Sequence, residues 1–144
     1  FGKSNVIAQT VHVAGDLRAL SPKQVEGAKK VMQQIVAKSL NGSQAELIFE
    51  DGYPPMGLTE GNKKLLALYS QASQDLGYNK VVAANPRNAG AADISFAANH
   101  VDMALDGLGL MGNGAHTKNE TADLTSLNKN TAKTALLIYR LGQL

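Results

Sequence analysis

The sequence predicts an α/β protein in which helices pack on a largely parallel sheet. Segments with the alternation of a strand and segments with the three- and four-residue spacing of a helix follow one another along the chain. Hydrophobic residues make up 44% of the 144 residues and charged residues 18%, which is typical of a globular protein with an apolar core. Alternation of the two element types favours a layered α/β architecture.

The first two elements are expected to be a strand and an amphipathic helix. The strand covers Val6–Leu20, and Gly15 would form a bulge that shifts its alternation. Residues 21–24, Ser-Pro-Lys-Gln, form a capping box with proline at the first helical position, so a helix is expected to begin there. Asn41 and Gly42 would end it. The apolar residues expected on its inner face are Val25, Ala28, Met32, Ile35, Val36 and Leu40.

A second strand is expected over Ala45–Glu50, and residues 51–55, Asp-Gly-Tyr-Pro-Pro, end it. Proline can neither donate to a strand ladder nor continue a helix. The sequence therefore predicts a domain boundary close to residue 57.

Helices and strands continue to alternate beyond this boundary. The expected elements are a helix over 59–76, a strand over 80–84, a helix over 90–98, a strand over 103–111, and a last helix that ends near 141. Thr125 or Ser126 is expected to cap the last helix. The inner face of the first of these helices is expected to carry Leu65, Leu66, Tyr69, Ala72 and Leu76, and that of the last Leu127, Ala135, Ile138 and Leu141.

Composition excludes several classes of function. The net charge is only +2, lysines and arginines are scattered, and aromatic residues make up 5% without any tryptophan, so no nucleic-acid surface is expected. No apolar run reaches the ~18 residues that a membrane span needs, so no membrane contact is expected. The chain has no cysteine, so a metal site would use histidine and carboxylates.

The glycine-rich segment 107–120 places His116 in a loop between an expected strand and an expected helix. An imidazole on sharply bending backbone is a good metal ligand, but a zinc ion needs three or four protein donors. No second histidine stands at ligand spacing from it. A phosphate-binding loop is excluded because no Gly-Lys-Ser/Thr follows the glycines.

Five motifs together resemble one family of enzymes. The chain is similar to the C-terminal part of the zinc-dependent metallopeptidases that include glutamate carboxypeptidase, the aminoacylases and succinyl-diaminopimelate desuccinylase. The motifs are residues 4–7 (Ser-Asn-Val-Ile), 15–18 (Gly-Asp-Leu-Arg), 51–55 (Asp-Gly-Tyr-Pro-Pro), 90–93 (Gly-Ala-Ala-Asp) and 114–120 (Gly-Ala-His-Thr-Lys-Asn-Glu). Their common order and separations make the resemblance specific.

The resemblance implies two domains. Residues 1–57 would be the second half of a βαββαβ (ferredoxin-like) lid or dimerisation domain, and residues 58–144 the C-terminal part of a three-layer α/β catalytic domain. The family's His-x-Asp segment, its Glu-Glu pair with the general base and a further carboxylate ligand come earlier in complete members. The chain is therefore expected to be a piece of a longer enzyme and to be inactive alone, with no catalytic residue of its own.

The resemblance also assigns roles to four residues. His116 matches the family's C-terminal zinc ligand, and Arg18 matches a lid arginine that binds a substrate carboxylate; a surface ion pair with Asp16 or Glu46 is the alternative for Arg18. Asn5 matches an asparagine that hydrogen-bonds the substrate or oxyanion region. Gly90 begins a turn whose backbone approaches the substrate.

Two further residues have open alternatives, and a third departs from the pattern of the family. Asp93 is equally an N-cap or a site residue, Glu120 would orient the His116 loop or simply lie near the next turn, and Ala8 replaces the proline usual in the family. His12 and His100 match no motif and are expected to be bystanders.

The implied activity is zinc-dependent hydrolysis of the amide bond of a peptide or N-acyl amino acid with a free carboxylate, by a homodimer that binds two zinc ions. Two other classes stay open: a non-catalytic dimerisation or binding module, and a family member that has lost catalysis. The compartment, cytoplasm or bacterial periplasm, and the substrate side chain are left undetermined.

Overall fold

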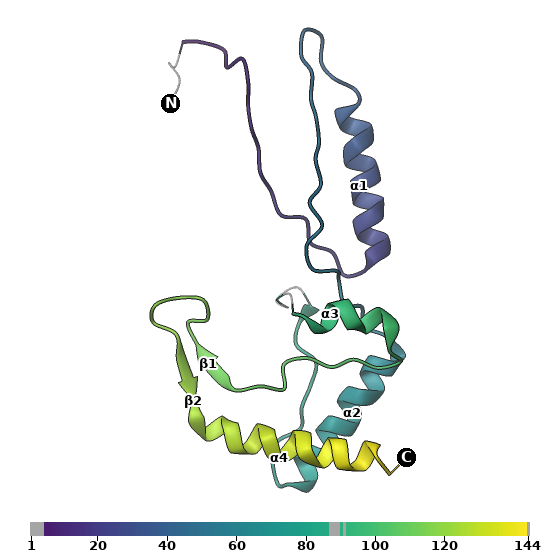
Figure 1. Cartoon of the computed structure of the whole chain (residues 1–144), viewed down its shortest axis with the longest axis vertical. Coiled ribbons are helices and arrows are strands. Elements are labelled where there is room, and N and C mark those ends of the chain that lie inside the picture. The colour runs from purple at the N-terminus through teal and green to yellow at the C-terminus, as the bar shows by residue number, and fades with distance from the viewer. Residues whose placement is uncertain (1–4, 87–89, 91, 144) are drawn as a thin grey trace. The chain divides into compact units, whose positions relative to one another are not determined.

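The computed structural model describes residues 5–86, 90 and 92–143. The chain forms two compact units, Phe1–Leu47 and Ile48–Leu144 (Figure 1). The division between them lies N-terminal to the boundary at residue 57 that the prolines predict. Assignment of these parts to a lid and a catalytic domain stays a prediction.

Among the described residues of the first unit, 5–47, one helix is present, α1 (Pro22–Val36), with segments that are not helical on either side. Its start confirms the expected capping box, because the Ser21 hydroxyl accepts the Gln24 N–H at 3.3 Å and the Gln24 side chain accepts the Leu20 N–H at 2.9 Å. The helix ends at Val36, earlier than Leu40, with Ala37 as its C-cap. The capping box thus predicted the start of α1 correctly, whereas the apolar pattern placed the end of the helix too late in the sequence.

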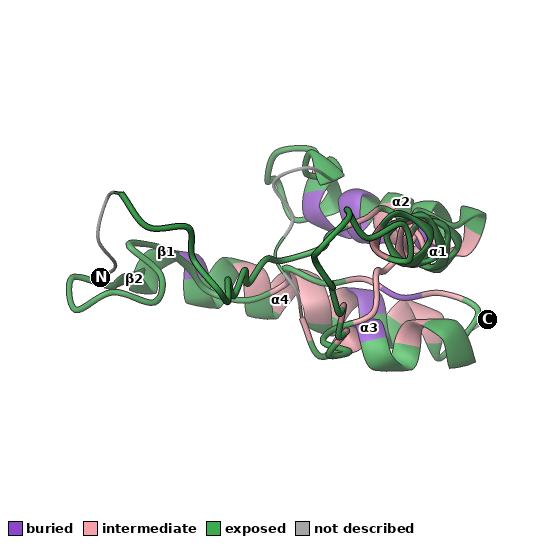
Figure 2. Cartoon of the chain, turned by 90° about the horizontal axis from the view of Figure 1, so that it is seen from above, coloured by how far each residue is buried: buried purple, intermediate pink, exposed green. Residues whose placement is uncertain are grey.

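The expected inner face of α1 is only partly covered, since Val25, Ala28 and Val36 are half-buried while Met32, Ile35 and Leu40 are exposed. No residue of the helix is buried, and Ile35 is 64% exposed (Figure 2). Nor do the flanking segments, 6–20 and 45–50, pair as strands. A strand is stabilised by hydrogen bonds to a neighbouring strand, and no described segment forms such a strand beside these two.

The only sheet in the described residues is a two-stranded antiparallel hairpin of β1 (Met111–Asn113) and β2 (Thr121–Asp123). Met111 pairs with Asp123 and Asn113 with Thr121. The described residues thus agree with the predicted mixture of helix and strand, but their one sheet is antiparallel and not the largely parallel sheet that the sequence predicts. Residues 80–84 and most of 103–111 form no strand ladder, since no described segment lies beside them as a partner strand.

The second unit is built on the packing of α2 (Glu60–Asp75) against α4 (Leu124–Leu141). The buried apolar residues of the described chain all belong to this unit: Tyr69, Ala72, Ala104 and Leu137. At the periphery of the helix pair, the Asp75 carboxylate and the Arg140 guanidinium form an ion pair at 2.6 Å. The Lys133 ammonium lies 5.4 Å from the centre of the Tyr69 ring. The helices are thus held by a small core and by polar contacts around it.

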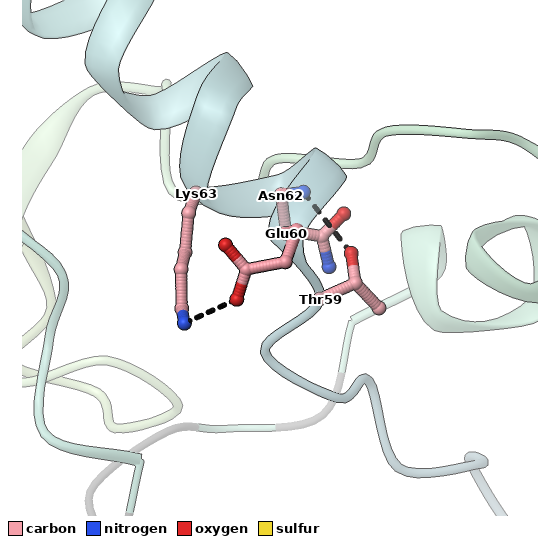
Figure 3. A network of polar contacts seen from close by, with 4 residues as sticks. All are labelled: Thr59, Glu60, Asn62 and Lys63. Atoms are coloured by element: carbon pink, nitrogen blue, oxygen red, sulfur yellow. Dashed lines mark hydrogen bonds and ion pairs between the residues drawn. The ribbon is translucent and has the colours of Figure 1, made fainter.

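Figure 3 shows the first turn of α2, where hydrogen bonds fix the chain entering the helix. The Thr59 hydroxyl caps it by accepting the Asn62 N–H at 3.0 Å. The buried Asn62 side chain donates to the Gly57 carbonyl at 2.8 Å and accepts the Ala104 N–H at 2.7 Å. Gly61 packs so closely on the Asp102 carbonyl that a β-carbon there would collide with it. This turn therefore anchors segment 102–104 to α2.

The remaining helices are shorter or begin earlier than the sequence predicts. Residues 94–100 form α3 (Ile94–Ala97) and the 3₁₀ turn η2 (Ala98–His100), so the helix expected over 90–98 begins later. The cap of α4 is Asp123, not Thr125 or Ser126, because the Asp123 carboxylate accepts the Thr125 N–H at 2.9 Å. Among the described helices, none combines the length and apolarity that crossing a membrane requires.

Candidate functional site

His116 lies in the loop that joins β1 to β2, at the tip of the hairpin that leads into α4 (Figure 1). The sequence predicted a loop between a strand and a helix, and the structure adds a short second strand between them. Ser126 ties this hairpin to α4, because its buried hydroxyl accepts the Met111 N–H at 2.9 Å and donates to the Asp123 carbonyl at 2.7 Å. Through this hairpin the loop is attached to α4, the longest of the described helices.

The backbone of the loop bends through two residues with positive φ. Gly114 has φ 68° and His116 has φ 63°, the only such non-glycine residue in the described chain. Left-handed backbone is rare for residues with a β-carbon and is found where surrounding contacts hold it. The contacts that hold it come from the loop itself.

Thr117 and Glu120 provide these contacts. The Thr117 hydroxyl donates to the Gly114 carbonyl at 2.7 Å, and the Thr117 N–H donates to the same carbonyl at 3.1 Å. The Glu120 carboxylate accepts the backbone N–H of His116 at 3.2 Å. Of the two alternatives for Glu120, orientation of the loop is therefore the one observed, through the backbone of His116. In the described chain no hydrogen bond engages the imidazole of His116, which is exposed.

The imidazole is suited to be one metal ligand. Nowhere in residues 5–86, 90 and 92–143 do three or more histidine, aspartate or glutamate side chains come together as a metal would require. Zinc takes three or four protein ligands, so the described residues do not form a zinc centre by themselves. Any centre that includes His116 would need further ligands.

Arg18 and Asn5, both exposed, lie in the first unit. The Arg18 Nε donates to an Asp16 carboxylate oxygen at 2.7 Å, and 76% of the Arg18 side chain is exposed. This is the surface ion pair that the sequence left open as an alternative. Exposed pairs of this kind contribute only ~0–1 kcal/mol, so a substrate carboxylate could replace Asp16 at little cost. The role of Arg18 in substrate binding stays a prediction, as does that of Asn5.

Gly90 belongs to the second unit and is exposed, three residues before Asp93 in the sequence. Ala91 within this motif, and Ser4 in the motif at the chain start, lie outside the described residues. Asp93 occupies the N-cap position of α3, but its side chain makes no capping hydrogen bond. The Tyr53 hydroxyl instead donates to the Asp93 carboxylate at 3.0 Å. Neither alternative drawn from the sequence for Asp93 included this partner.

Tyr53 thus joins two of the five motifs, residues 51–55 and residues 90–93. Its ring also lies 5.0 Å from that of Phe96, centre to centre, in a tilted arrangement. The hydrogen bond to Asp93, followed by the charge of that carboxylate, raises the pKa of the Tyr53 phenol. The sequence analysis did not single out Tyr53. Its place beside two prolines, inside one of the five motifs, could have marked it as a candidate.

Comparison with known proteins identifies the family. The model of Peptidase family M20/M25/M40 matches residues 4–140, almost the whole chain. The chain belongs to this family. Carboxypeptidase G2 of Pseudomonas sp. (strain RS-16) is similar to it, with 28% identity over 145 residues, 96% of this chain and 34% of that protein. No solved structure gives a match.

Family membership confirms the resemblance drawn from the five motifs and places the chain among peptidases. The chain spans about a third of the length of carboxypeptidase G2. Two thirds of that relative therefore have no counterpart in these 144 residues.

Proposed function

We propose that this chain is the C-terminal part of a zinc-dependent exopeptidase or amidohydrolase. The proposed reaction is hydrolysis of the amide bond of a peptide or N-acyl amino acid that carries a free carboxylate. The observation that carries this proposal is the His116 loop, an exposed imidazole on constrained backbone within a chain that matches the peptidase family over residues 4–140. The name of carboxypeptidase G2, of which the chain matches a third, agrees with it.

His116 is proposed to be one zinc ligand, and zinc would supply a Lewis acid and an activated water at such a site. The Gly114 turn, Thr117 and Glu120 would keep the imidazole in place before the metal binds, which lowers the entropy cost of binding. No step of the reaction is assigned to a residue of this chain, because the general base and the remaining ligands are expected on preceding sequence. The chain alone is accordingly expected to be inactive.

Arg18, Asn5 and Gly90 are proposed to bind the substrate. The planar guanidinium of Arg18 suits bidentate binding of a carboxylate once it leaves Asp16. Asn5 would hydrogen-bond the substrate or the oxyanion region, and the backbone at Gly90 would approach the substrate. The complete protein is proposed to be a homodimer joined through the lid that includes residues 1–57, in the cytoplasm or the bacterial periplasm.

The proposal is tested by His116→Ala in the protein encoded by the complete reading frame. Zinc content, measured by elemental analysis, and amidase activity on N-acyl amino acids are expected to fall together, because one ligand is lost. His100→Ala is the matched control, since His100 is an exposed histidine on η2. Full zinc occupancy in the His116 variant would rule out the ligand role.

A non-catalytic binding or dimerisation module is the second candidate. The observation that favours it is the partly exposed apolar face of α1, on which Met32 is 37% and Ile35 64% exposed. The complete reading frame distinguishes the two. His-x-Asp and Glu-Glu segments upstream support the enzyme, and a reading frame without them supports the module or a family member that has lost catalysis.

A further inference from the structure

We propose that Tyr53 is a positioning residue for residues 92–96, the segment that follows Gly90 in the sequence and begins α3, and that it acts by holding the carboxylate of Asp93. This inference rests on the proposed function, in which the backbone at Gly90 contacts the substrate. It assigns a specific task to residues 51–55, a motif that neither the ligand set nor the substrate-binding residues explain.

The geometry of Asp93 is the first argument. An aspartate at the N-cap position ordinarily has extended backbone and accepts an N–H from the first turn of the helix. Asp93 has helical backbone, with φ −58° and ψ −28°, and makes no such bond. Its carboxylate accepts the Tyr53 hydroxyl at 3.0 Å instead. The side chain is therefore used to connect two segments that are 40 residues apart in the sequence.

The second argument is that Tyr53 contacts α3 at two separate points. Its hydroxyl binds Asp93, and its ring packs against Phe96, one helical turn further along. Pro54 and Pro55 follow directly, and their fixed φ angles limit the conformations open to the segment that presents the tyrosine. Two contacts from a stiff segment restrain both the position and the rotation of the beginning of α3.

The third argument is that hydrogen bonds extend this restraint to Ala92. The buried Ser95 hydroxyl donates to the Ala92 carbonyl at 2.7 Å, and the Ser95 N–H donates to the same carbonyl at 2.9 Å. The Phe96 N–H donates to the Asp93 carbonyl at 3.1 Å. Residues 92–96 thus form one hydrogen-bonded unit. A shift of Asp93 would move Ala92, which follows Gly90 by two residues in the sequence.

The test uses Tyr53→Phe and Asp93→Asn in the complete protein, with Tyr139→Phe as the matched control because Tyr139 is 67% exposed on α4. With N-acetyl amino acids as substrates, Tyr53→Phe is expected to raise KM about three- to tenfold, the equivalent of one hydrogen bond, and to leave kcat within about twofold. The double variant should equal Tyr53→Phe, which removes the hydrogen bond by itself, whereas the amide oxygen introduced by Asp93→Asn can still accept the Tyr53 hydroxyl. A KM within twofold of wild type, or an equal rise in Tyr139→Phe, overturns the proposal.

Two readouts without catalysis separate this proposal from the proposed function. Hydrogen exchange of the peptide that contains residues 92–96 should be faster in Tyr53→Phe than in Tyr139→Phe. Ultraviolet titration should show that Asp93→Asn lowers the pKa of the Tyr53 phenol, identified by its absence in Tyr53→Phe. An inactive wild type with both effects present would reject the proposed function and keep the Tyr53 restraint. Unchanged exchange and titration would reject the restraint, whatever the activity.

Discussion

Asn62 shows how one polar side chain holds together segments that contain few apolar residues. It is buried, and it links the entry to α2 with segment 102–104 through Gly57 and Ala104. A buried amide that satisfies both its donor and its acceptor is specific in direction, unlike an apolar contact. No sequence pattern singled out Asn62, because its partner Ala104 is 42 residues away.

Asn62→Ala is expected to lower the free energy of unfolding by about 1–3 kcal/mol, because it leaves the buried Ala104 N–H without its acceptor. Urea unfolding followed by circular dichroism measures this change. Asn99→Ala, at an exposed asparagine in η2, should stay within ~0.5 kcal/mol of wild type. Equal losses in the two variants would contradict the role assigned to Asn62.

The contacts of the candidate site differ in how far apart in the sequence their partners lie. The His116 loop is closed by contacts within seven residues, Gly114 to Glu120, so its motif was recognisable in the sequence. The contact between Tyr53 and Asp93 spans 40 residues and was not. The sequence showed the motifs at residues 51–55 and 90–93 separately, but it did not show that they lie close together in the fold.

At the scale of elements, the packing of α2 on α4 ends in the ion pair of Asp75 and Arg140. A hydrogen bond from Gln71, followed by one from Arg140, lowers the pKa of the Asp75 carboxyl. The helix spacing predicted Tyr69 and Ala72 on an inner face, and both are buried. Leu127 and Ile138, predicted on the inner face of the last helix, are 48% and 65% exposed, so that part of the prediction is wrong. The charged contact between the helix ends could not be predicted, since it depends on where α4 crosses α2.

Stability is expected to fall in acid partly through Asp75. Because its pKa is lowered in the folded protein, the ionised carboxylate stabilises the fold above about pH 4, and this contribution is lost as the pH falls through the folded-state pKa. Asp75→Asn should therefore be less stable than wild type at pH 7 and should approach it below pH 4. Thermal unfolding between pH 2 and pH 7 measures the difference.

Asp106→Asn, which removes a charge from an exposed aspartate, is the control for this series. Its difference from wild type should be smaller at pH 7 than that of Asp75→Asn. A constant gap between wild type and the Asp75 variant from pH 7 to pH 2 would show that the ion pair with Arg140 does not contribute.

At the scale of the whole molecule, large apolar surfaces are uncovered in each unit. The face of α1 exposes Ile35, and a groove of about 410 Å³ in the second unit is lined by Leu108, Leu127 and Ile138 among others. Exposed apolar surfaces of this kind mark contacts with other chains or segments. They agree with the proposal that further sequence of the same enzyme completes both units.

The 144-residue chain is therefore expected to self-associate, and Ile35→Glu should weaken this by about tenfold or more, since burial of an isoleucine contributes ~1.5–3 kcal/mol. Sedimentation velocity at several concentrations measures the effect. Gln33→Glu adds the same charge to the polar side of α1 and should change association little. A dilute, cooperatively unfolding monomer in the wild type would contradict the expectation.

The family, the start of α1 and the candidate metal ligand were within reach of the sequence, because each depends on residues close together in the chain. The capping signal at Ser21 and the motif around His116 are examples, and the family match over residues 4–140 agrees with them. Hydrogen bonds and dihedral preferences within one turn or one loop need no distant partner.

Only the tertiary structure decided which segments meet. It left the segments predicted as parallel strands without a ladder, formed the antiparallel hairpin that carries His116, and brought Tyr53 to Asp93 and Asn62 to Ala104. Strand pairing and long-range hydrogen bonds depend on the neighbours that folding supplies. The same segment can therefore have the pattern of a strand and still lie unpaired where no partner strand is beside it.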